Sequence, residues 1–190
     1  MQSPIQSTQK PPLKFDRPLA IVGGGTVDPD LLQALVARDV ALIGADGGGN
    51  AIGAAARTPL FLLLRGPLGS GKSVLARSIA RGAGVEGVVP SPTFNLVFRY
   101  PSSRGVEVAH MDLYRLSDPS ELWELGWQEL GGQDELVLVE WPDRAEGMLP
   151  EHRWEITLGP VAGDREARMV SVSRFGVPQD LPGFPVSVDL

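Results

Sequence analysis

Cysteine is absent from this chain of 190 residues, and histidine occurs only twice, at His110 and His152. Without thiols there can be no disulfide bond and no thiolate metal site, so a reducing cytoplasm is the expected location. His110 has no second ligand at metal-binding spacing, and His152 is the only other histidine, which argues against a zinc site. The chemistry of this chain is therefore expected to rest on other residue types.

An excess of positive charge and long hydrophobic runs are also missing. The formal net charge is −6 at pH 7, the arginines are scattered, and Lys72 is the last lysine. Such a chain lacks the positive field that usually dominates affinity for nucleic acid, so any RNA would be held by a partner protein. No apolar run approaches the length of a membrane span, and residues 1–15 lack the apolar core of a signal peptide. We expect no association with a membrane.

Glycine is abundant, and its most informative occurrence is a complete GxxxxGK[ST] motif over residues 66–73. The apolar run 60–64 precedes the motif, and a helical pattern follows it over residues 74–81. A buried strand, a glycine-rich turn and a helix N-terminus are the context of a phosphate-binding loop. Lys72 would lie against the β- and γ-phosphates, and Ser73 would offer its hydroxyl to Mg²⁺. We predict a nucleoside triphosphate site formed by Gly66, Gly69, Ser70, Gly71, Lys72 and Ser73.

Two acidic residues follow predicted strands and could direct a metal ion or a water molecule. Glu140 ends the apolar run 136–139, where P-loop proteins carry a metal-side acid; the alternative is a charge that merely terminates the strand. Asp112 closes the predicted strand 106–111, and the alternative there is a cap or turn residue. We favour a catalytic role for both, and a metal-binding role for Glu140.

Three other side chains are weaker candidates for the same site. Thr93 lies after the P-loop helix, where GTPases carry a switch loop, but Ser-Pro-Thr is equally a common rigid turn, and spacing leaves both open. Trp141 directly follows Glu140, which makes a contact with the nucleotide credible. His110, a lone histidine near a strand end, is more typical of a hydrogen-bonded structural residue.

The order of the predicted elements indicates an α/β fold. Strands are predicted at 19–22, 40–43, 60–64, 94–100, 106–111, 136–139, 153–158 and 167–173, and helices at 51–57, 74–81 and 118–130. They predict a three-layer P-loop NTPase-like sheet with an antiparallel hairpin, preceded by a short α/β N-terminal segment. The expected divisions are a flexible leader (1–17), the N-terminal segment (18–57), a core (58–175) and an irregular tail (176–190).

Taken together, five ordered motifs resemble the TsaE family of bacterial tRNA threonylcarbamoyladenosine biosynthesis. They are residues 66–73, 91–97 (SPTFNLV), 110–116 (HMDLYRL), 124–126 (ELG) and 140–144 (EWPDR). The resemblance implies an ATPase that needs ATP and Mg²⁺, is weak alone, and works with TsaD and TsaB, which carry out the tRNA modification. It implies contact with tRNA only through these partners. The family's metal-side hydroxyl and acid fall on Ser73 and Glu140, the aspartate of its HxDLYR run on Asp112, and its nucleotide-site tryptophan on Trp141.

The chain departs from the family pattern in the P-loop and at the N-terminus. The family usually has Asp where this chain has Pro67, which removes one backbone donor, and Thr where it has Ser73, which keeps the hydroxyl. Residues 18–50 instead resemble the start of thiamine pyrophosphokinase, through residues 22–25, Asp28 and residues 45–50. The downstream acidic motif of that family is absent, so we expect no thiamine kinase activity.

Two other functions are compatible with the P-loop. A small-molecule kinase could use Asp112 as its base, although no Arg-rich lid is visible in the sequence. A non-catalytic, nucleotide-dependent interaction module would need binding alone. Phosphate release with and without partners, and a screen of phosphoryl acceptors, would separate these alternatives.

Overall fold

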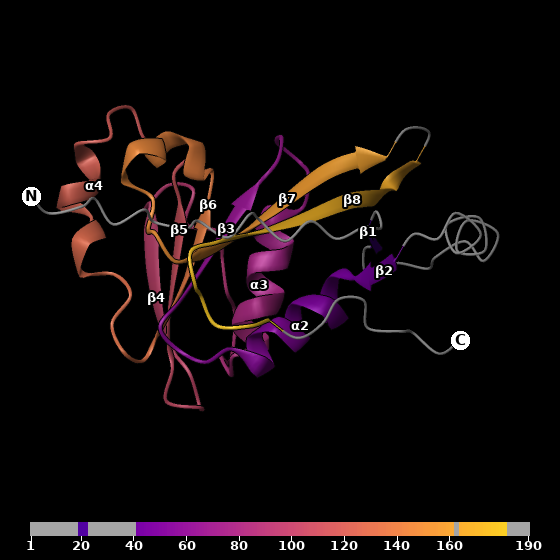
Figure 1. Cartoon of the computed structure of the whole chain (residues 1–190), viewed down its shortest axis with the longest axis horizontal. Helices are drawn as coiled ribbons and strands as arrows, with labels where there is room; N and C mark the ends of the chain where they lie inside the picture. Colours follow the sequence, from indigo (N-terminus) through magenta and orange to yellow (C-terminus); the bar gives the residue numbers. More distant parts are fainter. Residues whose placement is uncertain (1–18, 23–40, 162–163, 182–190) are drawn as a thin grey trace, which may run out of the picture.

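A computed structural model describes residues 19–22, 41–161 and 164–181 of the chain. The described residues form an eight-stranded sheet in the order β2-β1-β8-β7-β3-β6-β5-β4 (Figure 1). β8 runs antiparallel to both of its neighbours, β1 and β7, and β4 runs antiparallel to β5. All other neighbouring strands are parallel. The predicted α/β fold with an antiparallel hairpin is confirmed.

The centre of the sheet consists of three parallel strands: β3 (Leu60–Arg65), β6 (Glu135–Glu140) and β5 (Glu107–Asp112). Their continuous apolar character reflects burial on both faces, as expected for parallel strands covered by helices. Leu64 on β3 and Asp112 on β5 both pair with Glu140 on β6. The carboxyl ends of the three strands therefore meet at one edge of the sheet, directly beside the P-loop.

Two hairpins extend the sheet. β4 (Val97–Pro101) pairs with β5 at one edge. On the other side of β3, β7 (Arg153–Val161) pairs antiparallel with the long strand β8 (Asp164–Phe175). The two N-terminal strands, β1 (Leu19–Val22) and β2 (Ala41–Gly44), add to the far side of β8 in the same sheet.

Helices cover both faces of the sheet and give it three layers. One face packs against α2 (Ala45–Ala55) and α3 (Lys72–Gly82) through a cluster that includes Leu62, Leu64 and Leu138. The other face packs through Leu63, Val137 and Val139 against α4 (Glu121–Glu124), the 3-10 helix η1 (Trp127–Glu129) and η2 (Pro142–Met148). In Figure 1, α4 lies at the end of the molecule opposite β1 and β2.

Several element predictions were wrong at their boundaries. The helix predicted at 51–57 is α2, which begins earlier, at Ala45, and ends at Ala55. The predicted helix over 118–130 is broken, because Gly126 has φ 72° and separates α4 from η1. Residues 94–96 precede β4 rather than belonging to it. Asp28, the glycines at 23–25 and the part of the predicted tail beyond residue 181 lie outside the described residues.

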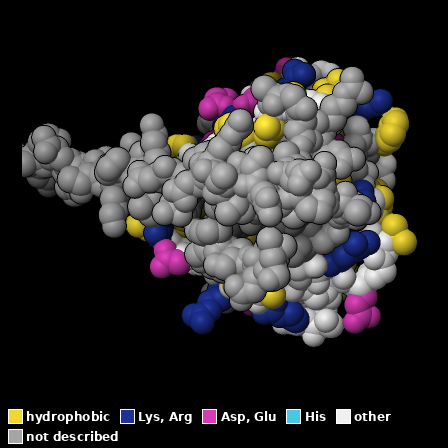
Figure 2. Space-filling view, turned by 90° about the vertical axis from the view of Figure 1, so that its right-hand side faces the viewer, with side chains coloured by type: hydrophobic (Ala, Val, Ile, Leu, Met, Phe, Trp, Pro, Cys, Tyr) yellow, Lys and Arg dark blue, Asp and Glu magenta, His cyan; other side chains and the backbone are white. Residues whose placement is uncertain are grey.

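The surface carries charges of both signs. On the face shown in Figure 2, basic and acidic side chains of described residues are interspersed, with no continuous basic patch among them. None of the helices in the described ranges has the length and hydrophobicity to cross a bilayer.

Candidate nucleotide site

The P-loop joins the end of β3 to the first residue of α3. The backbone φ angles of Gly66, Gly69 and Gly71 are 134°, 76° and 99°. Residues that have a Cβ atom rarely adopt such positive values. A Cβ atom added at Gly69 or Gly71 would enter open space, so the backbone of the loop is accessible to a ligand there. The hydroxyl of Ser70 is buried and has no hydrogen-bond partner among the described residues. A phosphate group fits this cradle, because the helix N-terminus supplies amide donors and a phosphate oxygen would satisfy the hydroxyl.

Lys72 is the cation of this loop and is only 4% exposed. Its ammonium donates hydrogen bonds of 2.9 Å to the carbonyl oxygens of Gly66 and Pro67, and it lies 3.8 Å from the ring centroid of Trp141. Burial lowers the pKa of Lys72, and the nearby carboxylates of Glu140 and Asp112 oppose that shift. The loop therefore holds a desolvated cation between its own carbonyls and an aromatic face.

Glu140 and Ser73 come together beside this cation. The Ser73 hydroxyl donates to Oε2 of Glu140 at 2.8 Å, across 67 residues of sequence. The other carboxylate oxygen, Oε1, is 2.9 Å from Nε2 of His110. Glu140 is almost completely buried, at the carboxyl end of β6. The two residues predicted to be metal ligands are thus in direct contact.

Asp112 and Thr93 form a second pair, one strand further along the sheet. The Thr93 hydroxyl donates to Oδ2 of Asp112 at 2.7 Å, and the backbone amide of Tyr114 donates to Oδ1 at 3.0 Å. The backbone amide of Asp112 in turn donates to the carbonyl of Leu96, a residue with the uncommon φ of 63°. The loop that contains Thr93 is therefore attached to the same strand end as the acidic residues.

Trp141 adopts the left-handed conformation, with φ 59° and ψ 47°, which is rare for a bulky residue. Its ring lies 4.9 Å from that of Tyr114 between centroids, in addition to covering Lys72. Arg65, the residue before the P-loop, forms an ion pair with Asp143 two positions after Trp141, and donates to Glu155 on β7 at 2.7 Å. Arg65 thereby links the base of the P-loop to the segment that carries the tryptophan.

Arg65, Tyr114 and Arg168 are site residues that sequence reasoning missed. Arg168 on β8 donates to the backbone carbonyls of Ser70 at 3.2 Å and Gly69 at 3.3 Å. No local motif marks either arginine: Arg65 directly precedes the P-loop but contacts Glu155 on β7, and Arg168 reaches the P-loop from β8. Tyr114 had a signal, since it belongs to the HMDLYRL run.

The donor set fits Mg²⁺ held together with a phosphate. Ser73 and Glu140 provide hard oxygen ligands, and Mg²⁺ typically takes one or two protein oxygens, with phosphate oxygens and water completing its shell. Within the described residues there is no group of three or more His, Asp or Glu side chains placed to hold a metal by itself. A cation at this position would accordingly be shared with the phosphates.

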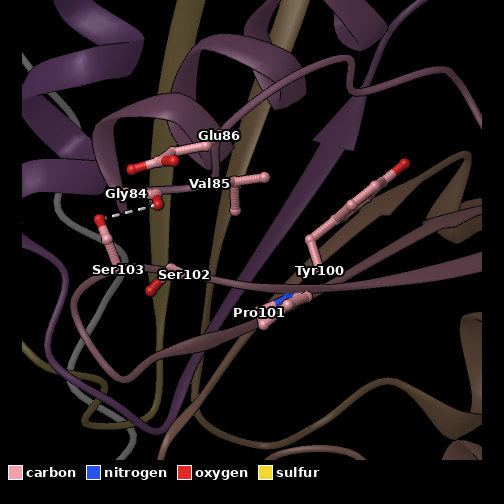
Figure 3. A pocket seen from close by; sticks show the side chains of 7 residues that line it. All are labelled: Gly84, Val85, Glu86, Tyr100, Pro101, Ser102 and Ser103. Carbon is pink, nitrogen blue, oxygen red and sulfur yellow. Dashed lines mark hydrogen bonds between the residues drawn. The ribbon is translucent and has the colours of Figure 1, made fainter.

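A separate cleft lies at the other end of α3 (Figure 3). Its volume is about 390 Å³, and its lining comes from the loop after α3 and from the β4–β5 hairpin: Gly84, Val85, Glu86, Tyr100, Pro101, Ser102 and Ser103. Ser103 donates to the carbonyl of Gly84 at 3.1 Å across it. None of the predicted site residues lines this cleft. The better candidate site is therefore the P-loop together with the carboxyl ends of β3, β6 and β5, which we call the P-loop edge.

Comparison with known proteins agrees with this arrangement. The model of the family described as "Threonylcarbamoyl adenosine biosynthesis protein TsaE" matches residues 45–168. The chain belongs to the TsaE family. The match begins at Ala45, so α2 lies inside the family region, whereas the sequence motifs predict a start near residue 58.

Individual TsaE proteins are similar over the same region. That of Haemophilus influenzae is 41% identical over 117 residues, which cover 62% of this chain and 73% of the relative. That of Bacillus subtilis is 38% identical over 105 residues (55% and 64%), and that of Streptomyces coelicolor 34% over 119 residues (61% and 80%). A crystal structure of Bacillus subtilis YdiB superposes with a TM-score of 0.57 at 25% identity, covering 90% of each chain. All three named relatives are tRNA threonylcarbamoyladenosine biosynthesis proteins.

Proposed function

We propose that this chain is a cytoplasmic ATPase subunit required for threonylcarbamoyl modification of tRNA adenosine, acting with TsaD-like and TsaB-like proteins. Membership of the TsaE family supports the pathway, and the P-loop edge supports the ATPase activity. The observation that carries the second part is the 2.8 Å contact between Ser73 and Glu140 beside the buried Lys72. A hydroxyl, a carboxylate and a cation at one P-loop are the groups that nucleotide hydrolysis requires.

Each residue of the P-loop edge has a proposed role that follows from its charge and position. Lys72 and the backbone amides of residues 69–73 would bind the β- and γ-phosphates, and Lys72 would exchange the loop carbonyls for phosphate oxygens. Ser73 and Glu140 would hold Mg²⁺, which when bound neutralises charge on the phosphates. Glu140 and Asp112 would orient the attacking water, and Thr93 would bring its loop toward the phosphates. Trp141 would stack beside the nucleotide.

Because the chain is acidic, we propose that its partner proteins bind the tRNA. A chain with net charge −6 has little electrostatic affinity for a polyanion, so ATP hydrolysis here would act on tRNA through a complex. We propose that residues 18–57 serve as the lead-in to the ATPase core, because β1 and α2 pack directly onto it.

Phosphate release from Mg·ATP, measured with the chain alone and with TsaD and TsaB added, tests the proposal. We expect slow release by the chain alone and faster release in the presence of both partners. Binding without release under either condition would favour the interaction module. Transfer of phosphate to an added nucleoside, sugar or thiamine would favour the kinase.

A further inference from the structure

His110 is buried, with 1% of its surface exposed, and the proposed ATPase mechanism gives it no step. We infer that His110 is a positioning residue: its Nε2–H holds the Glu140 carboxylate in the orientation that presents Oε2 to Ser73 and to Mg²⁺. This inference rests on the proposed function of the same site. It replaces the interpretation of His110 as a purely structural histidine.

The geometry forms a chain of three groups. His110 Nε2 lies 2.9 Å from Oε1 of Glu140, and Oε2 of the same carboxylate accepts from Ser73 at 2.8 Å. With one oxygen fixed from each side, the carboxylate cannot rotate about its terminal bond without breaking a hydrogen bond. In metal sites, the partners that orient the ligands typically contribute on the order of 10–100-fold to metal affinity or activity.

The contact also has a defined direction. A carboxylate can only accept, so the ring proton lies on Nε2. Nδ1 is buried and has no hydrogen-bond partner within the described part of the chain, as suits an unprotonated ring nitrogen. His110 shares its face of β5 with Val108, in an otherwise apolar layer against α3. A residue needed only to fill this layer could be replaced by an apolar side chain, whereas a positioning residue could not.

The first test measures the Mg²⁺ dependence of ATP binding by calorimetry in three single variants. His110→Leu keeps the volume and removes the donor. His110→Gln places an amide N–H near the position of Nε2, and His110→Asn carries the same amide on a shorter side chain. We expect the Leu and Asn variants to need about 10–100-fold more Mg²⁺ for half-maximal enhancement of ATP affinity, and the Gln variant to stay within about threefold of the parent. His152→Gln, at an exposed position, is the matched control and should equal the parent.

The second test uses the low histidine content of the chain. With ¹⁵N-labelled histidine, only His110 and His152 contribute ring signals. We expect His110 to show a proton on Nε2 alone, and its Nε2 signal to shift in Glu140→Gln while the His152 signals stay in place. This readout needs neither ATP nor hydrolysis.

The outcomes separate the inference from the proposed function. If the parent binds Mg·ATP and the folded Leu or Asn variant has the same Mg²⁺ dependence, His110 is structural and the inference is overturned. The same conclusion follows if the Nε2 signal of His110 does not shift in the Glu140→Gln variant. If the parent binds no Mg·ATP, the proposed function fails and the inference falls with it. Should the Leu variant not fold, the comparison of Gln with Asn still decides.

Discussion

At the scale of single residues, the carboxylate of Glu140 has two different hydrogen-bond partners, Ser73 and His110. Glu140→Gln keeps the shape of the side chain but removes the charge that would direct Mg²⁺ or polarise water. We expect ATP still to bind at saturating Mg²⁺, with a higher Mg²⁺ requirement than the parent, while phosphate release falls by about a hundredfold or more, the scale of losing one preorganised electrostatic group. Calorimetry and a phosphate-release assay measure the two quantities separately.

The matched control is Glu151→Gln, which removes the same charge at an exposed position. It should hydrolyse ATP like the parent. Should Glu140→Gln do so too, Glu140 would only terminate its strand, and the assignment of this residue would be wrong.

Which site residues can be predicted from the sequence depends on how local their signal is. Lys72, Ser73 and Glu140 lie in short motifs that contain their own structural context, a strand followed by a turn, and the structure brings them together. Arg65 and Arg168 could not be predicted in this way. Arg65 meets Glu155 across 90 residues and Arg168 meets Ser70 across 98, so their roles depend on the order of strands in the sheet.

At the scale of elements, helix α2 begins at Ala45, before the start predicted at residue 51. Three consecutive glycines in residues 47–49 disfavour a helix, yet α2 runs through them. Small residues allow α2 to approach α3 closely: a Cβ atom at Gly53 would overlap the carbonyl oxygen of Ile79 and lie 2.6 Å from the amide nitrogen of Ala83. Tertiary packing therefore outweighs the low helix propensity of glycine.

Gly53→Ala tests this close packing. Alanine raises helix propensity, but here the two helices must move apart, and we expect a net loss of about 1–3 kcal/mol of unfolding free energy. Gly132→Ala is the control, since a Cβ atom there meets nothing within 4 Å. Urea unfolding of both variants gives the comparison. A Gly53→Ala variant as stable as the parent would show that α2 and α3 are not in close contact.

Arg65 on β3 forms ion pairs with Glu155 on β7 and with Asp143 on η2. These pairs predict that the stability of the protein depends on pH. Burial raises the pKa of Glu155, but hydrogen bonds and charges from Arg65 and Arg153 outweigh it, so the pKa lies below the ordinary value of 4.5. A lowered carboxylate pKa adds stability that is fully present above the unfolded-state value and is lost as the pH falls through the folded-state value.

Arg65→Gln removes part of this stabilisation. We expect a loss of about 1–3 kcal/mol of unfolding free energy at neutral pH, and a smaller difference from the parent as the pH falls below 4.5. Urea unfolding at a series of pH values measures the difference, with the exposed Arg81→Gln as control. A difference that stays constant down to about pH 3 would contradict the role given to the Arg65–Glu155 pair.

At the scale of the whole molecule, β1 and β2 extend the sheet that contains the P-loop strand β3. The sequence predicted both strands but not their place, because pairing between residues 19–22 and 167–170 depends on contacts far apart in the chain. Deleting residues 1–44 would expose the edge of β8, and unpaired strand edges promote aggregation. We expect the thermal midpoint to fall by ~5 °C or more, or the protein to aggregate.

Deletion of residues 1–17 is the control for this truncation, because it removes no described strand. It should leave the thermal midpoint and ATP binding unchanged. If residues 45–190 alone were as stable as the full chain, the N-terminal strands would be an appendage rather than a part of the fold.

The central claim is that the P-loop edge binds Mg·ATP through Lys72, and calorimetric titration of Mg·ATP into the parent and into Lys72→Ala tests it most directly. The substitution removes a buried ammonium whose charge-assisted contacts with phosphate are each worth about 1.5–3 kcal/mol, so we predict a fall in affinity of about a hundredfold or more. Lys14→Ala, the same substitution ahead of the described residues, should bind like the parent. Equal ATP affinity in Lys72→Ala and the parent, or no binding by the parent, would contradict the claim.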